Sequence, residues 1–246
     1  MGNLKIYAFA DETSPLIDEQ IVAMKRNELD GLEIRNVDNV NVADITIEKA
    51  KEVRKKLEDQ GLLVWSVGSP IGKIDIEKDD FQEHFEKFKH VVEVSHELNA
   101  ENIRLFSFYV PTDKNPDDYR NEVVERLGIF VDYVTDSGIV LCHENEKGIY
   151  GDNVKRCLEI FKSLPQMKGI FDPANFVQCE EDTLKAWEVL HPYIKYLHIK
   201  DAMENGSIVP AGKGIGNIPA IISSYKKMGG NAITMEPHLA IFDGLS

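Results

Sequence analysis

The chain alternates between short apolar segments and longer amphipathic segments along its whole length. The short segments are apolar on both faces and rich in Ile, Val, Leu and aromatic residues, which is typical of parallel strands buried on both sides. Eight such strands are predicted, at residues 4–10, 31–35, 62–68, 102–108, 139–144, 168–172, 194–199 and 232–236.

The segments between these strands have helical periodicity. Phe81, Phe85, Phe88 and Val92 recur at spacings of four, three and four residues, which places them along one stripe of a helix. Further helices are predicted at 46–60, 116–135, 152–163 and 181–190, and one more follows the glycine-rich stretch 212–216.

Eight strands with helical crossovers, repeating about every 30 residues, predict a single α/β domain over residues 1–246, a (β/α)₈ TIM barrel. An open doubly wound sheet is the alternative, but eight near-equal units favour closure. The chain stops ten residues after the last predicted strand, so the closing helix is predicted to be short or missing.

Composition narrows the class of protein further. The chain has 42 acidic and 28 basic residues, and a formal net charge of −14 argues against a nucleic-acid or anionic-membrane partner. The three cysteines form no CxxC pair, as expected of free thiols in a reducing compartment. Because there is no signal-peptide pattern and no apolar run of about 20 residues, a cytoplasmic protein is expected.

Nearly every predicted strand ends on a polar or charged residue, although the strand bodies are apolar. Catalytic groups of parallel barrels come from these carboxyl ends. Glu144, Asp172, His198 and Glu236 end four consecutive strands. Since neighbouring strands lie about 4.8 Å apart, the four side chains can converge on one point.

Three converging carboxylates would repel one another and have raised pKa values unless a cation joined them. We therefore expect one divalent metal ion. Oxygen-rich ligands with one imidazole suit Mn²⁺, Mg²⁺ or Co²⁺, and Zn²⁺ is a further candidate. The alternative is that each carboxylate caps a helix or pairs with a basic side chain.

Several motifs carry a family resemblance. CHENE (142–146), FDPANF (171–176), YLHIKD (196–201) and MEPH (235–238) resemble the sugar-phosphate isomerase/epimerase superfamily, whose barrel is xylose isomerase-like. FADE, GSPIGK and RLFSFY extend the resemblance to almost the whole chain. It implies a metal ion held by Glu144, Asp172, His198 and Glu236. In the ketose 3-epimerases of this superfamily the two metal-bound glutamates also move the proton, which implies that role for Glu144 and Glu236.

The expected activity is that of a metal-dependent sugar or sugar-phosphate isomerase or epimerase. A metal chelated by a carbonyl and the neighbouring hydroxyl acidifies the C–H between them and stabilises a cis-enediolate. Two carboxylates on opposite faces of the substrate can then remove and return the proton. A keto-sugar or keto-cyclitol dehydratase shares this step and is the alternative. An abasic-site endonuclease, which needs more histidines, and a non-catalytic sugar-binding protein are less favoured.

Other residues are weaker candidates for contacting the substrate. Lys200 lies on the same face as His198 and could bind a substrate oxygen or phosphate, or pair with Asp201. Glu33 and Arg35 could form a pair that contacts sugar or a purely structural pair. The ketose 3-epimerases have a histidine where this chain has Asn175. The substrate-binding candidates are Lys200, Asn175, His238, Arg35, Glu33 and Lys73.

Three further patterns favour a structural role. The glycine-rich stretch 212–216 could cradle phosphate at a helix N-terminus, but a tight turn also explains it. His143 has the opposite parity to Glu144 and is expected to face the helices. His84, His90 and His96 are predicted to lie on a solvated helix face.

The chain is compatible with a homo-oligomer.

Overall fold

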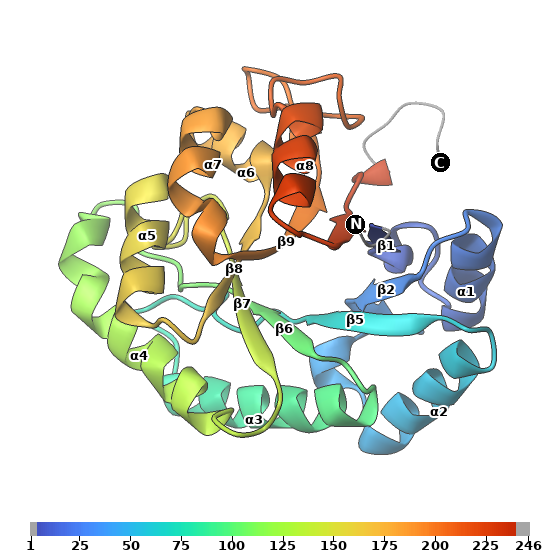
Figure 1. Ribbon diagram of the computed structural model, residues 1–246. Helices are drawn as coiled ribbons and strands as arrows, with labels where there is room; N and C mark the ends of the chain where they lie inside the picture. The colour runs from blue at the N-terminus through green and yellow to red at the C-terminus, as the bar shows by residue number, and fades with distance from the viewer. Residues whose placement is uncertain (1–3, 240–246) are drawn as a thin grey trace.

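The computed structural model describes residues 4–239 and shows a closed barrel of eight parallel strands with helices around it (Figure 1). The strands are β1 (Lys5–Ala8), β2 (Gly31–Ile34), β5 (Leu63–Gly68), β6 (Asn102–Leu105), β7 (Val140–Glu144), β8 (Lys168–Phe171), β9 (Ile194–Ile199) and β12 (Ala232–Met235). They pair in chain order, and β12 closes the barrel on β1 with Ala232 opposite Lys5. The predicted TIM barrel and its eight strands are confirmed.

Helices cover the outside of the barrel in the order that the sequence predicts. They are α1 (Ile17–Arg26), α2 (Ile47–Glu58), α3 (Phe81–Glu97), α4 (Arg120–Tyr133), α5 (Val154–Ser163), α7 (Thr183–Leu190) and α8 (Ile218–Lys227), with the short α6 (Pro173–Gln178) directly after β8. No helix was predicted at α1, which lacks a side-chain N-cap, or at α6. The segment where a closing helix would form, 240–246, lies outside the described residues.

The buried side chains form two main layers. The larger layer packs the strands against the helices. A smaller cluster contains Tyr7, Cys142, Ile170, Tyr196 and Ala232. Cys142 stands two residues before Glu144, and Tyr196 two residues before His198, so each pair shares one face of its strand. The barrel interior is therefore apolar below and charged above, at the carboxyl ends.

One irregularity lies between β2 and β5. Leu32 pairs with Val64 but Glu33 pairs with Ser66, so Trp65 is an extra residue in β5, a β-bulge. The Trp65 ring stacks on Tyr7 at 5.2 Å between centroids, and Ser66 Oγ lies 3.0 Å from the Tyr196 hydroxyl. Two consecutive residues of β5 therefore both contact the interior of the barrel.

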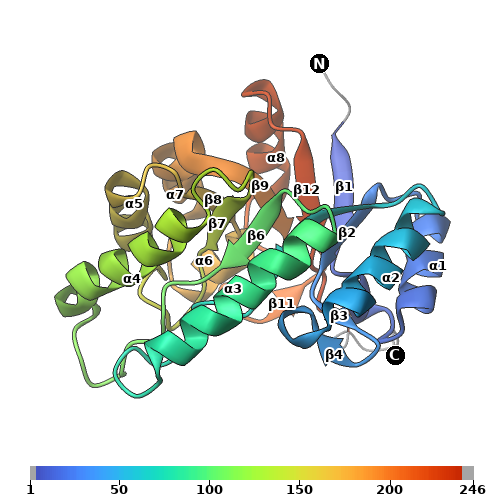
Figure 2. The same cartoon turned by 90° about the horizontal axis from the view of Figure 1, so that it is seen from below.

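Two small hairpins follow the carboxyl ends of strands. β3 (Asn36–Val37) pairs with β4 (Val40–Asn41) after β2, and β10 (Asp201–Ala202) pairs with β11 (Ile208–Val209) after β9. Both lie at the same end of the barrel, where the polar strand ends meet (Figure 2). Among residues 4–239, no helix has both the length and the apolar character needed to cross a bilayer.

Candidate metal centre

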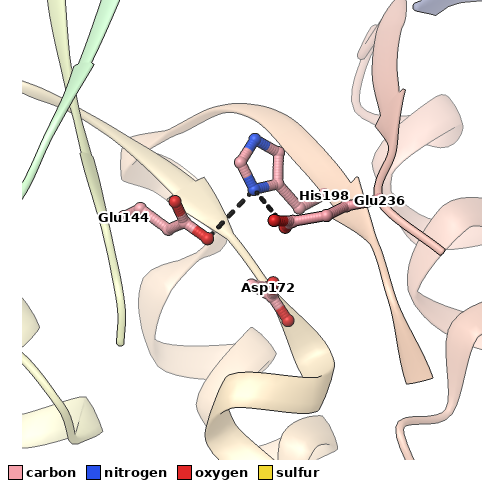
Figure 3. Close-up of side chains that lie close together, drawn as sticks. All are labelled: Glu144, Asp172, His198 and Glu236. Carbon is pink, nitrogen blue, oxygen red and sulfur yellow. Dashed lines mark hydrogen bonds and ion pairs between the residues drawn. The ribbon is translucent and has the colours of Figure 1, made fainter. Parts of the chain in front are cut away.

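The structure brings the four predicted metal ligands together. Glu144, Asp172, His198 and Glu236 are all buried, and one ligand atom from each lies within 4.8 Å of the others. His198 Nδ1 is 3.0 Å from Glu144 Oε1 and 3.4 Å from Glu236 Oε2 (Figure 3). Because β7, β8, β9 and β12 are successive strands of the barrel, residues at their ends converge as expected.

Asp172 has two separate contacts. It follows β8 directly and begins α6, where its Oδ1 accepts a hydrogen bond from the Asn175 N–H at 3.0 Å. Its Oδ2 lies 2.8 Å from Lys200 Nζ, without a well-aligned hydrogen bond. The helix cap considered as an alternative to metal binding therefore uses only one oxygen of Asp172, and the other lies in the cluster.

Lys200 places an ammonium group inside the cluster. Its Nζ contacts Asp172 Oδ2 at 2.8 Å and Glu236 Oε2 at 3.3 Å, and the side chain is only 6% exposed. Of the alternatives that the sequence left open, the pair with Asp201 is not formed: the recorded ion pairs of Lys200 are with the two candidate ligands. Such a contact offsets the cost of burying a carboxylate.

Two arginines pair with the other carboxylate oxygens. Arg104 Nη1 lies 3.3 Å from Glu144 Oε2, and Arg35 Nη1 lies 3.5 Å from Glu236 Oε1. Arg35 is itself held by Asp11, whose Oδ2 accepts from Arg35 Nε at 2.8 Å. Each of the three candidate carboxylates therefore has a basic neighbour.

The buried charges shift the acidity of these groups in different directions. Burial raises the pKa of Asp172 to about 6, with Lys200 opposing the shift and Glu144 adding repulsion. Burial acts in the same sense on Glu144, but His198 and Arg104 outweigh it and lower the pKa of Glu144 to about 2. At Glu236, Lys200 and hydrogen bonds from histidines outweigh burial and hold the pKa well below its usual range. Both glutamates are therefore ionised at neutral pH.

The donor set fits a divalent ion. Three carboxylates and one imidazole are the ligands that Mn²⁺, Mg²⁺ and Co²⁺ accept. Glu144 Oε2 and Asp172 Oδ2 are buried and accept no well-aligned hydrogen bond, although Arg104 and Lys200 lie beside them, so each keeps a lone pair that a cation could use. Glu144, Asp172, His198 and Glu236 are the residues that could hold it.

The remaining substrate-binding candidates lie at different distances from the cluster. Asn175 Nδ2 contacts Glu144 Oε1 at 3.3 Å and donates to the Asn145 carbonyl at 2.8 Å. His238 is 40% exposed at its side chain, with Nε2 3.5 Å from Glu236 Oε1. Lys73 pairs with Glu146 at 2.8 Å and is not among the residues that contact the cluster.

Glu33 and Arg35 do not pair with each other. Arg35 joins Asp11 to Glu236, as described above, and is half-buried. Glu33 has no exposed surface, and its Oε2 lies 2.9 Å from His198 Nε2, on the side of the imidazole away from the cluster. The structure thus separates two residues that the sequence grouped.

The backbone of the glycine-rich stretch 212–216 surrounds the side chain of Asp201. Its carboxylate accepts backbone hydrogen bonds of 2.9–3.0 Å from Ala202, Gly212, Gly214 and Gly216. A Cβ at Gly214 would lie 2.5 Å from Asp201 Oδ1, so only glycine fits there. The donors of this loop are directed at a carboxylate of the chain itself, so the turn explains the glycines.

The solvated face predicted for the histidines of α3 is wrong at His84 and holds only in part at His90, whose half-buried ring lies 2.8 Å from the Ile45 carbonyl. His143 faces the helices as expected, with Nε2 2.9 Å from Ser107 Oγ and its ring against Phe161. His96 is exposed, but His84 is buried, because the loop before α3 covers it and the Gly72 N–H donates to its Nε2 at 2.8 Å. The solvated face predicted for His84 is therefore wrong.

Sequence analysis missed two residues that brace the cluster. Tyr196 lies two residues before His198, and this spacing could have identified it as sharing its face. Asn145 clamps the ends of β7 and β8: its side chain donates to the Asp172 carbonyl and accepts from the Asp172 N–H, each at 3.0 Å. No local pattern marks Asn145, because its partner is 27 residues away.

Comparisons with known proteins agree with this architecture. The profile of the xylose isomerase-like TIM barrel family matches residues 21–240. No curated protein matches the chain by sequence.

Solved structures share the fold at low identity. A xylose isomerase-like TIM barrel protein from Mycobacterium smegmatis, in complex with magnesium, has a TM-score of 0.79 and 16% identity, over 100% of this chain and 94% of that chain. The probable 3-DHS dehydratase AsbF of Bacillus anthracis gives 0.78 and 16%, over 96% and 93%. The 3-keto-D-glucoside 4-epimerase of E. coli gives 0.73 and 15%, over 96% and 92%. From the family match, the chain belongs to the xylose isomerase-like TIM barrel family.

Proposed function

We propose that the protein is a divalent-metal-dependent isomerase or epimerase of a sugar or sugar phosphate. The observation that carries the proposal is the buried set of Glu144, Asp172, His198 and Glu236, with ligand atoms within 4.8 Å of one another at the carboxyl ends of four strands. A divalent ion held there would act as a Lewis acid toward a carbonyl and the hydroxyl beside it. The similarity of the fold to the solved 3-keto-D-glucoside 4-epimerase, over 96% of this chain, supports the proposal.

Glu144 and Glu236 are the proposed acid–base pair. They come from β7 and β12, with β8 and β9 between them, so they approach the substrate from two sides. Both are ionised, and each is fixed by a basic neighbour, Arg104 and Arg35 respectively. One removes the proton from the carbon next to the carbonyl, and the other returns it.

The surrounding side chains orient the substrate in this proposal. The Lys200 ammonium lies between Asp172 and Glu236, where it can donate a hydrogen bond to a substrate oxygen or phosphate. Asn175 steadies Glu144, and His238 lines the exposed side of Glu236. Burial of the whole cluster excludes water from the ionised pair and strengthens its electrostatic interactions.

A dehydratase is the second candidate, favoured by the similarity of the fold to the probable 3-DHS dehydratase over 96% of this chain. The same glutamates would remove the proton, and a hydroxyl on the next carbon would then leave as water. Since both reactions begin with the same proton removal, only the product distinguishes them.

The test is solvent deuterium exchange. Ketoses, keto-cyclitols and their phosphates are incubated in D₂O with Mn²⁺-loaded protein, and products are identified by NMR. Wild type should incorporate deuterium at one carbon, and Glu144→Gln and Glu236→Gln should each reduce the rate by about 10²–10⁴-fold.

The matched control is Glu86→Gln, at an exposed glutamate of α3 paired with Lys89, which should exchange at the wild-type rate. Full turnover by both site variants would contradict the assignment of these glutamates. Loss of water from the substrate would instead favour the dehydratase.

A further inference from the structure

Glu33 reaches across the barrel to the candidate metal centre. It lies on β2, which is separated from β9 and its His198 by β1 and β12. Its Oε2 nevertheless lies 2.9 Å from His198 Nε2. With 0% of its surface exposed, Glu33 is not accessible to a substrate entering at the carboxyl ends, so its partners are groups of the protein.

A buried hydrogen-bond network fixes the Glu33 carboxylate. Its Oε1 accepts from the Tyr196 hydroxyl at 2.9 Å, and that hydroxyl lies 3.0 Å from Ser66 Oγ. Tyr196 and Ser66 are both 0% exposed. The β-bulge at Trp65 puts Ser66 opposite Glu33, so the local shape of β5 supplies this network. Each oxygen of Glu33 therefore has one partner: Oε1 bonds the Tyr196 hydroxyl and Oε2 bonds His198 Nε2.

The same network orients the His198 ring. The Phe9 ring meets it in an edge-to-face arrangement and the Tyr196 ring is tilted against it, with ring centroids at 5.3 and 5.6 Å. A neutral imidazole carries its proton on one nitrogen and a lone pair on the other. Since Glu33 bonds Nε2, Nδ1 is the nitrogen that faces Glu144 and Glu236. An ion bound among these residues would take the Nδ1 lone pair, and the proton would stay on Nε2 beside the Glu33 carboxylate.

We propose that Glu33 is a positioning residue for the metal centre, holding His198 so that Nδ1 faces the ion. This assignment rests on the proposed function, because it assumes that the cluster binds a divalent ion. In this proposal Glu33 contacts His198 and not the substrate, which was its expected partner from the sequence. Carboxylates that orient metal-bound histidines typically contribute about 10–100-fold in metal affinity.

The test measures metal binding without substrate, by calorimetric titration of the metal-free protein with Mn²⁺. Glu33→Gln can still turn an amide oxygen toward Nε2–H but carries no charge, so we expect affinity to fall about 10-fold. Glu33→Ala removes the partner altogether, and the expected loss is about 100-fold. Glu86→Gln, a loss of charge on the outer surface, should bind Mn²⁺ like wild type.

The outcomes separate this assignment from the proposed function. If wild type and both Glu33 variants bind Mn²⁺ equally, Glu33 does not position His198, and the metal centre stands without it. If wild type binds no divalent ion, both the assignment and the proposed function fall. Near-UV circular dichroism shows whether each variant keeps its tertiary packing.

A measurement on wild type decides the case in which the variants do not fold. Zn²⁺-loaded protein with ¹⁵N-labelled histidine is examined by long-range ¹H–¹⁵N NMR, and His198→Gln identifies the signals. The proton is expected on Nε2 and the metal at Nδ1. A proton on Nδ1, with Nε2 bound to the metal, would overturn the assignment.

Discussion

Lys200 supplies positive charge inside the buried cluster of carboxylates. Its ammonium contacts Asp172 and Glu236, two of the proposed ligands, and it is nearly as buried as they are. Breaking a buried ion pair by removing one partner leaves an uncompensated charge, at a typical cost of about 3–5 kcal/mol. Lys200 therefore contributes to stability as well as to the proposed chemistry.

For Lys200→Met we expect metal-free protein to unfold at a lower temperature than wild type. Mn²⁺ should then stabilise the variant more than it stabilises wild type, because the ion replaces a missing positive charge beside Asp172 and Glu236. Thermal denaturation with and without Mn²⁺ measures both effects. Lys87→Met, which removes a surface pair with Asp44, is the control. An equal Mn²⁺ shift in wild type and Lys200→Met would show that the ammonium and the ion do not share these carboxylates.

The sequence predicted the four candidate ligands and several residues around them, but not which groups these residues contact, for a physical reason. Strand ends are visible as a polar residue after an apolar run, and parallel strands bring their ends together. The direction of a long side chain is not encoded locally. Glu33 and Arg35, both on or beside β2, contact opposite sides of the cluster, which no spacing along the chain reveals.

Among the elements, α3 has an interaction that its amphipathic pattern conceals. His84 is buried on this helix and accepts a hydrogen bond from the Gly72 N–H, which joins α3 to the loop after β5. Burial is the main cause that lowers the pKa of His84 to about 4. Its neutral form is therefore the one that the folded state requires.

The stability of the fold should fall in acid partly through His84. The unfolded chain, with a histidine pKa near 6.5, binds more protons than the folded chain between about pH 6.5 and pH 4. Above pH 6.5 the neutral His84 makes its full contribution to stability. As pH falls, that contribution to the free energy of unfolding is lost, by up to about 3 kcal/mol at pH 4.

His84→Gln keeps an acceptor for Gly72 but does not titrate, so its urea stability should depend less on pH than that of wild type. His96→Gln, at an exposed position of the same helix, should keep the wild-type dependence. Parallel pH profiles for wild type and His84→Gln would contradict this role of His84.

The strands were predictable because their apolar runs are continuous, and the long helices because their stripes are regular. α1 was not predicted, since it spans ten residues and its N-cap residue is Leu16, which cannot cap; the carboxylate that accepts from its first N–H is that of Asp38, 21 residues away. α6 was not predicted because its six residues follow β8 without a loop. The start of α6 does carry a local signal, the Asp172 cap followed by Pro173, but six residues are too few to show a helical stripe.

At the scale of the whole molecule, the excess of 42 acidic over 28 basic residues sets the long-range field. Nucleic-acid binding depends on basic groups that neutralise phosphates, and its affinity falls steeply with salt. The family fold by itself does not decide this question, because function resides in the site and the surface charge.

We expect no salt-sensitive binding of duplex DNA by the protein in the range of about 50–200 mM salt. Fluorescence anisotropy with an abasic duplex and its undamaged counterpart measures this directly, in the presence of Mn²⁺ or Zn²⁺. Tight binding or cleavage of the abasic duplex by homogeneous protein would reverse the ranking of sugar over nucleic acid as the substrate.

The bulge in β5 lets this strand keep its pairing in the closed barrel while two consecutive side chains, Trp65 and Ser66, both face inward. A barrel of this kind closes only with a fixed stagger between strands, whereas the alternation of side chains allows only every second residue to face inward. With one residue to spare, β5 turns both Trp65 and Ser66 inward, one for packing and one for the Glu33 network. Shortening β5 by that residue would restore a regular ladder yet turn either the aromatic ring or the hydroxyl outward. An insertion or deletion tolerated by the fold could thus still misalign the proposed metal centre.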